Sequence, residues 1–414
     1  MISELIIEEV FNDQQINLRI RDKGILRDID YEYLIKSEQI VVITGIRRCG
    51  KSTVLHHLTA YFEDFAYINF DDERLFNFQL EDFQKLLLII KKIKPTKNIF
   101  IDEIQNVPNW ERFVRRIHDE GYKIFITGSN SKLLSSELST HLTGRHTKLE
   151  LFPFSFKEYI KWLNISNTEL TSDNKARLLG AFDEYLVNGG FPGYIRNKEG
   201  DYLRNIYEDI IYKDLIMRFG IKNIKSLKIL AQYLMTNFTK ETSYNSLKNI
   251  LNISSVNTIK DYIDYLQQAY MIFECYKYDY SLKKQQTYNK KCFVIDNGLR
   301  TAVAFQFNAD LGQLLENMVY IDLRRHCSEI YFYKTRENYE IDFLVDSPQY
   351  KLIQVCYSTA DKKTMQREIR SLEKVMSELK IKESYLLTYN EEDTYKTGDS
   401  IIYIKPVWKW VLNL

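Results

Sequence analysis

The amino-acid sequence predicts an α/β protein with more than one domain. Its 414 residues exceed the size at which a single hydrophobic core usually stops growing. Three short apolar stretches, at residues 40–43, 97–101 and 123–127, have the composition of buried β-strands. Each stretch leads within two residues into glycine, acidic or small polar residues, as the functional loops of α/β sheets do. We therefore expect a sheet whose functional residues follow its strands.

The overall composition is that of a folded protein without long linkers. Hydrophobic residues make up 45% of the chain and charged residues 27%, while 30 Tyr and 23 Phe supply aromatic side chains for several cores. The 15 Gly and 6 Pro form no linker-like run, so we expect the domains to pack closely. A net charge of +1 gives the whole molecule no electrostatic attraction to a polyanion.

The N-terminal segment and the cysteines predict a cytoplasmic protein with reduced thiols. Residues 1–15 carry acids where a secretory signal needs a basic start, and no run of about 18 apolar residues occurs, so we expect no membrane segment. The five cysteines are scattered and never spaced as CxxC. This pattern argues against both a disulfide framework and a zinc site.

The strand at 40–43 leads into a phosphate-binding motif. Residues 45–52, Gly-Ile-Arg-Arg-Cys-Gly-Lys-Ser, match G-x-x-x-x-G-K-[ST], and the following residues can continue as a helix. In such a loop backbone N–H groups turn onto the β-phosphate, Lys51 reaches the β and γ oxygens, and the Ser52 hydroxyl contacts Mg²⁺. A chance match in a loop is the alternative, but the flanking strand and helix favour a nucleotide site. The predicted ligands are ATP and Mg²⁺, and the predicted nucleotide-binding residues are Gly45, Ile46, Arg47, Arg48, Cys49, Gly50, Lys51, Ser52 and Thr53.

Two adjacent acids close the strand at 97–101. A carboxylate at the end of a strand beside the phosphate loop can hold the Mg²⁺ shell, and we assign this role, with Ser52, to Asp102. Glu103 would point toward the γ-phosphate and polarise the attacking water as a general base. A solvated acidic turn is the alternative, and the buried strand before these residues favours the catalytic interpretation.

Three further polar residues are candidates for catalysis near the γ-phosphate. The strand at 123–127 ends close to Ser129 and Asn130, and either side chain can hydrogen-bond the phosphate or the attacking water. Capping of a helix at 131–134 explains either residue equally well. Arg145 is a candidate arginine finger, which a neighbouring subunit often supplies, or an ordinary solvated arginine.

These motifs resemble the prokaryotic AAA-type ATPases that end in a domain of unknown function with a restriction-endonuclease-like fold. The resemblance spans nearly the whole chain and implies a P-loop NTPase core with five strands in the order 5-1-4-3-2. It also implies a homo-oligomer, with a ring as one form. The segments that carry it are RRCGKST, YINFDDERL (67–75), IDEIQNVPNWERFVRR (101–116), ITGSNSKLLSSELSTHLTGR (126–145) and LFPFSFKEY (151–159).

Three further domains are predicted after the ATPase core at 1–160. A helical lid is predicted at 161–220, interrupted by a glycine-rich turn at 189–193. Three helices followed by a basic hairpin then indicate a winged helix at 221–295. The remaining residues, 296–414, are predicted to form the restriction-endonuclease-like domain.

The basic charge of the chain is concentrated in the predicted winged helix. Residues 221–291 contain eleven Lys, no Arg and five acids, a net charge of +6, with lysines at 283–284 and 290–291 in the hairpin. This segment is therefore our candidate for a nucleic-acid contact. Many winged helices contact proteins instead, and both interpretations stay open.

The C-terminal domain resembles a PD-(D/E)XK nuclease core with incomplete chemistry. In an active member a helix Glu, a strand Asp and a carboxylate two positions before a lysine hold Mg²⁺ and polarise water. Glu316 and Asp342 fit the first two places, but Gln354 replaces the carboxylate and Cys356 the lysine. A neutral amide is a weak Mg²⁺ ligand and a neutral thiol lacks the field of an ammonium, so we expect no DNA cleavage unless a lysine elsewhere compensates. The domain then offers a face for a protein partner.

The sequence thus predicts a Mg²⁺-dependent ATPase of the AAA type. ATP binding and hydrolysis would drive conformational work on a protein or nucleic-acid partner. One alternative is a nucleotide-controlled switch or scaffold with slow hydrolysis. The other is an ATP-dependent nuclease.

Overall fold

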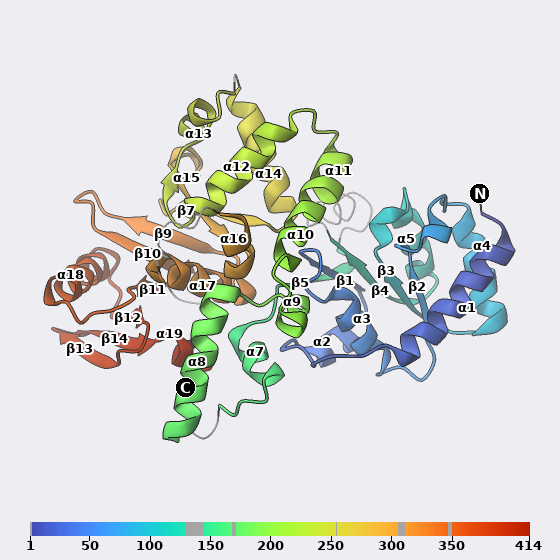
Figure 1. Cartoon of the computed structure of the whole chain (residues 1–414), viewed down its shortest axis with the longest axis horizontal. Coiled ribbons are helices and arrows are strands. Elements are labelled where there is room, and N and C mark those ends of the chain that lie inside the picture. Colours follow the sequence, from blue (N-terminus) through green and yellow to red (C-terminus); the bar gives the residue numbers. More distant parts are fainter. Residues whose placement is uncertain (1, 130–143, 168–170, 254, 305–310, 347–349) are drawn as a thin grey trace. The chain divides into compact units, whose positions relative to one another are not determined.

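The computed structural model describes the chain as two compact units, shown in Figure 1. The first unit comprises residues 1–152 and 268–270, and the second comprises 153–267 and 271–414. The finer division into four domains stays a prediction. The described residues are 2–129, 144–167, 171–253, 255–304, 311–346 and 350–414.

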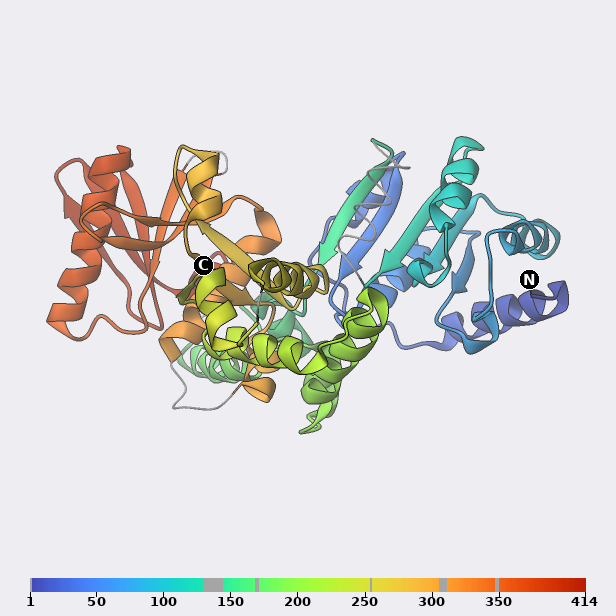
Figure 2. The same ribbon diagram turned by 90° about the horizontal axis from the view of Figure 1, so that it is seen from above.

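The first unit is built on a parallel five-stranded sheet of order β2-β3-β4-β1-β5. This is the predicted order 5-1-4-3-2 read from the opposite edge, so the α/β class and the P-loop core are confirmed. Figure 2 shows these strands, blue to green, with helices packed against them. The strands are β1 (Ile40–Gly45), β2 (Ala66–Asn69), β3 (Asn98–Asp102), β4 (Lys123–Gly128) and β5 (His146–Leu151).

Helices cover both faces of this sheet because successive strand residues point to opposite faces. On one face Val42 and Ile101 pack with apolar residues of α1, α4 and α5. On the other face Phe100 stacks on Phe125, and both contact Phe62, which follows α3. The helices are α1 (Glu4–Ile20), α2 (Tyr31–Lys36), α3 (Lys51–Thr59), α4 (Asp82–Ile93) and α5 (Trp110–Asp119), with single 3₁₀ turns at Glu73–Leu75 and Ile104–Asn106.

The second unit contains a mixed sheet of order β13-β14-β12-β11-β10-β9-β7-β8-β6. In it β7 pairs in parallel with β9, so strands of the predicted winged helix and strands of the predicted nuclease-like domain belong to one sheet. The strands are β6 (Glu241–Thr242), β7 (Ile272–Lys277), β8 (Lys290–Val294), β9 (Ile330–Lys334), β10 (Glu340–Asp346), β11 (Tyr350–Val355), β12 (Glu383–Thr388), β13 (Asp393–Thr397) and β14 (Ser400–Pro406).

Helices dominate the first half of the second unit, as the sequence predicts. Three of them, α12 to α14, precede the antiparallel pair β7 and β8, whose connection contains the short helix α15. The helices are α7 (Phe156–Trp162), α8 (Ser172–Asn188), α9 (Pro192–Asn197), α10 (Tyr202–Asp209), a π-helical turn (Ile210–Ile216), α11 (Met217–Phe219), α12 (Ile224–Thr236), α13 (Tyr244–Ile250), α14 (Val256–Gln268), α15 (Leu282–Thr287), α16 (Asn297–Val303), α17 (Leu311–His326), α18 (Lys362–Leu379) and α19 (Val407–Val411).

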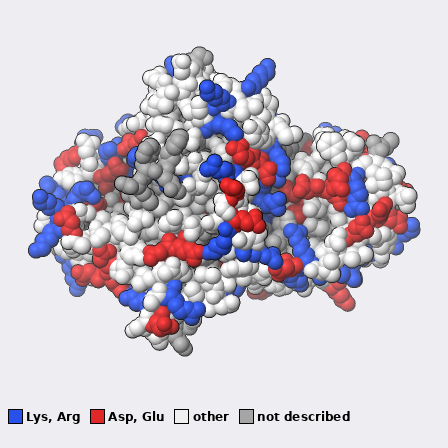
Figure 3. Space-filling view, in the orientation of Figure 1, with Lys and Arg blue, Asp and Glu red and all other residues white. Residues whose placement is uncertain are grey.

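The surface carries both signs of charge. On the face drawn in Figure 3, Lys and Arg side chains lie intermixed with Asp and Glu side chains, in keeping with the net charge of +1. Within the described ranges, no helix combines the length and the apolar character that crossing a membrane requires.

Candidate functional site

The predicted phosphate loop connects β1 to α3. Gly45 is the last residue of β1 and Lys51 is the first of α3, so residues 46–50 form the turn, and Ser52 and Thr53 lie in the first turn of the helix. The first backbone N–H groups of a helix have no partner within it, which makes this end of α3 suited to an anion. The Lys51 ammonium is buried and donates to the carbonyls of Gly45 (3.1 Å) and Ile46 (3.2 Å).

Glycine is required at the start of this loop. Gly45 has φ +152°, and a Cβ on it would lie 2.1 Å from the carbonyl oxygen of Leu151 at the end of β5. Gly50, with φ +105°, also adopts a conformation that residues with a Cβ rarely adopt. The loop therefore runs close against the carboxyl end of β5.

Arg27, which was not among the predicted site residues, stabilises the same loop through hydrogen bonds. Its guanidinium donates to the carbonyls of Cys49 (3.0 Å) and Phe152 (2.7 Å), and the residue is buried. The Cys49 thiol donates to the Leu151 carbonyl at 3.4 Å. Burial raises the pKa of this thiol, although Lys51 and Arg27 oppose the effect. No motif surrounds Arg27 in the sequence, so only the folded chain reveals its role.

Asp102 lies at the end of β3 and near the other predicted Mg²⁺ ligand. The hydroxyls of Tyr67 (3.1 Å) and Thr127 donate to its carboxylate, and the side chain of Ser52 lies near enough to favour the ionised form of that carboxylate. Burial raises the pKa of Asp102, and the neighbouring Glu103 adds to the rise. A cation bound at this carboxylate would favour its ionised form. These oxygen donors therefore fit a hard cation such as Mg²⁺.

Glu103 has an unusual backbone conformation and engaged hydrogen-bonding groups. Its φ is +52°, which is uncommon for a residue with a Cβ and often marks a functional site. Its N–H donates to the Thr127 hydroxyl at 3.0 Å, and the Gln105 amide donates to its carboxylate. Thr127 thus hydrogen-bonds both Asp102 and Glu103. Tyr67, Thr127 and Gln105 were not predicted as part of the site.

Ser129 follows β4 and is buried. Because β4 lies between β3 and β1, Ser129 follows the strand that separates the acidic pair from the phosphate loop. Asn130, the other candidate at this position, lies outside the described residues.

Arg145 lies at the opposite end of the sheet from the phosphate loop. It precedes β5, and its carbonyl accepts from the N–H of Ile40, the first residue of β1. The loop follows Gly45, the last residue of β1, and six residues of strand span about 20 Å. The Arg145 guanidinium pairs with Asp119 of the same chain. Arg145 is therefore remote from the nucleotide loop of its own chain.

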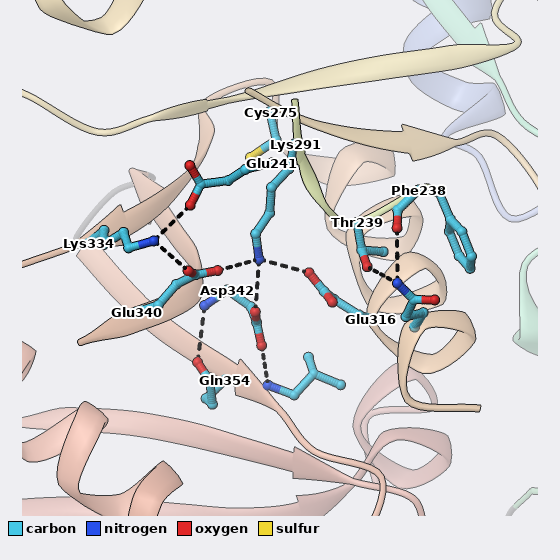
Figure 4. Close-up of polar contacts among 12 residues, drawn as sticks. Phe238, Thr239, Glu241, Cys275, Lys291, Glu316, Lys334, Glu340, Asp342 and Gln354 are labelled. Atoms are coloured by element: carbon cyan, nitrogen blue, oxygen red, sulfur yellow. Dashed lines mark hydrogen bonds and ion pairs between the residues drawn. The ribbon is translucent and has the colours of Figure 1, made fainter. Parts of the chain in front are cut away.

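The C-terminal candidate residues surround Lys291, which the sequence analysis placed in the basic hairpin of the predicted winged helix (Figure 4). Glu316 on α17 and Asp342 on β10 both contact the ammonium of Lys291, which comes from β8. Gln354 on β11 hydrogen-bonds the backbone of Asp342. The Cys356 thiol instead donates to the Ser358 carbonyl, and burial raises its pKa to about 11.

The predicted basic hairpin presents fewer lysines than its sequence suggests. Lys290 and Lys291 are buried, so neither is available to a phosphate backbone. Lys283 and Lys284, on α15, are exposed. Nucleic-acid binding by residues 221–291 therefore stays a prediction with weaker support than the charge count gave.

Comparisons with family models divide the chain into three segments. Residues 37–160 match the AAA domain, residues 179–310 match a domain of unknown function (DUF8612), and residues 311–410 match another domain of unknown function (DUF4143). The nuclease-like fold of the last segment therefore stays a prediction.

Two solved structures illustrate the distant similarities. The Walker-type ATPase of Pyrococcus abyssi is 16% identical, with a TM-score of 0.42, over 69% of this chain and 99% of that chain. AMPPCP-bound DnaA from Aquifex aeolicus is 16% identical, with a TM-score of 0.25, over 57% of this chain and 85% of that one.

Two uncharacterized proteins are much more similar in sequence. A Haemophilus influenzae protein is 30% identical over 326 residues, which cover 74% of this chain and 79% of that protein. A Methanocaldococcus jannaschii protein is 38% identical over 430 residues, covering 99% of this chain and 96% of the relative. The chain therefore belongs to the family that includes the Methanocaldococcus jannaschii protein, and its residues 37–160 match the AAA domain.

Proposed function

We propose that this protein is a Mg²⁺-dependent ATPase that couples ATP binding and hydrolysis to conformational work on a partner. The observation that carries the proposal is the placement of Asp102 at the carboxyl end of β3, beside the phosphate loop that leads into α3, with the Ser52 side chain near enough to favour the ionised form of its carboxylate. It joins the two residues that the motifs assign to Mg²⁺, although they lie 50 positions apart on α3 and β3. Family membership gives independent support, because the matched AAA domain contains all of these residues.

The residues of the loop would bind the nucleotide phosphates. Backbone N–H groups of residues 45–53 and the Lys51 ammonium would neutralise the β- and γ-phosphates. Ser52 and Asp102 would hold Mg²⁺, which supplies charge stabilisation to the phosphates when it is bound. The buried contacts of Arg27 and Tyr67 keep the loop and Asp102 in place before the nucleotide arrives.

Glu103 would act as the general base. Its carboxylate would accept a proton from the attacking water, while Ser129, with Asn130, would hydrogen-bond that water or the γ-phosphate. Its backbone bond to Thr127 restrains Glu103 next to Asp102. Arg145 would contribute its charge to a neighbouring subunit, because about 20 Å of sheet separates it from its own loop. The proposed active form is therefore a homo-oligomer.

Replacement of Asp102 tests the proposed metal dependence. Asp102→Asn keeps the size of the side chain but removes its charge, so hydrolysis with saturating Mg²⁺ should fall by at least about 100-fold. The exposed Asp64→Asn is the matched control and should hydrolyse ATP at the wild-type rate. Phosphate release, measured with Mg²⁺ and with EDTA, follows the reaction. Equal rates for Asp102→Asn and wild type would exclude the assignment.

A nucleotide-controlled switch with slow hydrolysis is the second candidate function. The Gln105 amide holds the carboxylate of the proposed base, which favours a low basal rate until that bond is released. Turnover distinguishes the two: rates on the order of 1 s⁻¹ or faster, raised by a partner, indicate mechanical work. The same assay with added duplex and single-stranded DNA identifies the class of partner.

A nuclease is the function with the weakest support. Gln354 and Cys356 lack the charges that metal-dependent cleavage needs: the amide carries none, and the Cys356 thiol, whose pKa burial raises to about 11, is protonated at pH 7. Supercoiled plasmid incubated with the protein, ATP and Mg²⁺ or Mn²⁺ should stay intact.

A further inference from the structure

Lys291 lies at the centre of a group of three carboxylates, of which Asp342 is buried and Glu316 and Glu340 are partly buried. We call this group the Lys291 cluster: Lys291, Glu316, Glu340 and Asp342 (Figure 4). Its ammonium is 2.8 Å from Glu340 Oε1 and 3.1 Å from both Glu316 Oε1 and Asp342 Oδ1. The Lys291 side chain is only 5% exposed. The three acids, rather than water, therefore solvate this cation.

The spacing of the three acids matches an ammonium group. A lysine ammonium has three N–H donors and no acceptor, and one oxygen from each of the three carboxylates lies 2.8–3.1 Å from its nitrogen. Carboxylate oxygens bind Mg²⁺ and Ca²⁺ at shorter distances, about 2.0–2.6 Å. Over the part of the chain that the structure describes, no group of three or more His, Cys, Asp or Glu is arranged to hold a metal ion. The carboxylates of the cluster are therefore spaced to surround the Lys291 ammonium and not a metal ion.

Gln354 supports this arrangement in a way that a carboxylate would not. Its Oε1 accepts from the backbone N–H of Asp342 at 3.0 Å, and its Nε2 donates to Glu368 Oε2 at 2.9 Å. A carboxylate at position 354 has no donor for the second bond. The remaining oxygen of Asp342 accepts from the N–H of Val355 at 3.0 Å, so both oxygens of Asp342 are engaged.

The charges of the cluster depend on one another. Burial by itself would lower the pKa of Lys291, but Glu316, Asp342 and Glu340 outweigh it and raise the pKa well above its usual value. Burial would likewise raise the pKa of Glu340, and Lys291 with Lys334 lowers it overall. Without Lys291, three acids that are at least partly buried would face one another without a cation at their centre.

We propose that Lys291 is a built-in counter-ion that takes the place of a divalent metal ion among Glu316, Glu340 and Asp342. The site then needs no metal in the natural protein. Replacing Lys291 by a small neutral residue would let the acids close in around an added divalent ion. An open cavity of about 690 Å³ borders Glu340 and Asp342 and gives such an ion access. The proposal is independent of the ATPase function.

Mn²⁺ binding to the full-length protein without nucleotide tests the proposal. Mn²⁺ is added to wild type, to Lys291→Ala and to Lys291→Ala/Asp342→Asn, and the concentration of free Mn²⁺ is measured by electron paramagnetic resonance. We expect Lys291→Ala to bind one more Mn²⁺ per chain than wild type, with a Kd of roughly 10⁻⁴–10⁻³ M, and the double variant to lose this ion. Mn²⁺ should also recover part of the thermal midpoint that Lys291→Ala loses, but leave that of wild type unchanged.

Lys334→Ala is the matched control. Lys334 contacts Glu340 and Glu241 but is more exposed, and its removal leaves the Lys291 ammonium in place, so no additional Mn²⁺ should bind. Two outcomes contradict the proposal: a wild-type Mn²⁺ site that Asp342→Asn removes, or a folded Lys291→Ala that gains no site. If Lys291→Ala does not fold, the comparison of wild type with Asp342→Asn decides alone, and equal Mn²⁺ binding by the two supports the proposal.

Discussion

At the scale of single residues, Thr127 contacts both acids of the proposed nucleotide site, although the sequence analysis assigned it no role. Its hydroxyl donates to the carboxylate of Asp102 and accepts from the N–H of Glu103. A valine would fill the same space and satisfy neither bond. The proposed metal ligand and the proposed base are therefore held by one side chain from the neighbouring strand β4.

Gln105 gives the first residue-scale prediction. Gln105→Ala removes the amide that donates to the Glu103 carboxylate, so the proposed base becomes free to approach water. A hydrogen bond of this kind is worth about 1 kcal/mol net, so basal turnover should rise by up to about fivefold. Steady-state hydrolysis and the Kd for ATP are measured together, and the Kd should not change.

A fall in turnover for Gln105→Ala would show instead that the amide orients Glu103 for catalysis. Asn106→Ala is a control in the same turn, because Asn106 donates to the Phe70 carbonyl and not to Glu103. It should leave basal turnover near the wild-type rate.

At the scale of elements, the turn after α8 is tied to α16 by a buried acid. The Asp296 carboxylate accepts from the N–H groups of Gly190 (2.6 Å) and Leu299 (3.0 Å). A Cβ on Gly189 would lie 2.1 Å from Asp296 Oδ1, so glycine is required where the chain passes this acid. The glycine-rich turn that the sequence marked as a break between helices is therefore also a binding site for an internal carboxylate.

Asp296 predicts how stability depends on pH. Burial raises its pKa to about 6 from 3.8, although backbone hydrogen bonds oppose the rise. Between about pH 4 and pH 6 the unfolded chain loses this proton while the folded chain keeps it. Stability should therefore fall as pH rises through this window, by up to about 1.4 kcal/mol per pH unit from this group.

Urea unfolding at several pH values, with wild type and Asp296→Asn, checks this dependence. The difference in unfolding free energy between the two proteins should change across the window and level off above pH 6, because an amide does not titrate. The partly buried Asp322, whose pKa is also raised to about 6, titrates in both proteins and cancels in the comparison. A difference that is constant from pH 4 to pH 7 would refute the assignment.

The elements also show why part of the site could be predicted from the sequence and part could not. The phosphate loop is contiguous, and the acids follow their strand directly, so local patterns located Lys51, Ser52 and Asp102. Tyr67 and Thr127 reach Asp102 only because β2 and β4 flank β3 in the sheet. Strand order is a long-range property, and no local pattern places a tyrosine beside an aspartate 35 residues later.

At the scale of the whole molecule, the net charge of residues 221–291 suggested the wrong role for Lys291. Lys291 adds to the net charge of +6 in residues 221–291, yet it is buried among acids of α17 and β10. The sequence could not show this because Glu316 and Asp342 lie 25 and 51 residues further along the chain than Lys291. The resemblance to a nuclease core located Glu316 and Asp342, but not the cation between them.

Subunit mixing tests the proposed homo-oligomer. Arg145→Ala keeps an intact phosphate loop, and Lys51→Ala keeps an intact candidate finger. Mixing the two should recover hydrolysis above the weighted sum of the separate proteins, because some interfaces then combine the intact halves. Strictly additive rates would exclude a finger supplied by a neighbouring subunit, and native mass measured on the same mixture reports the assembly.

The central claim is that this chain hydrolyses ATP with Glu103 as its base. The most direct test is the single-turnover rate of Glu103→Gln beside wild type, with the exposed Glu81→Gln as the control. Glu103→Gln should bind ATP as tightly as wild type and hydrolyse it at least about 100-fold more slowly, since it keeps the shape of the side chain but cannot accept the proton. Hydrolysis by Glu103→Gln at the wild-type rate would contradict the account.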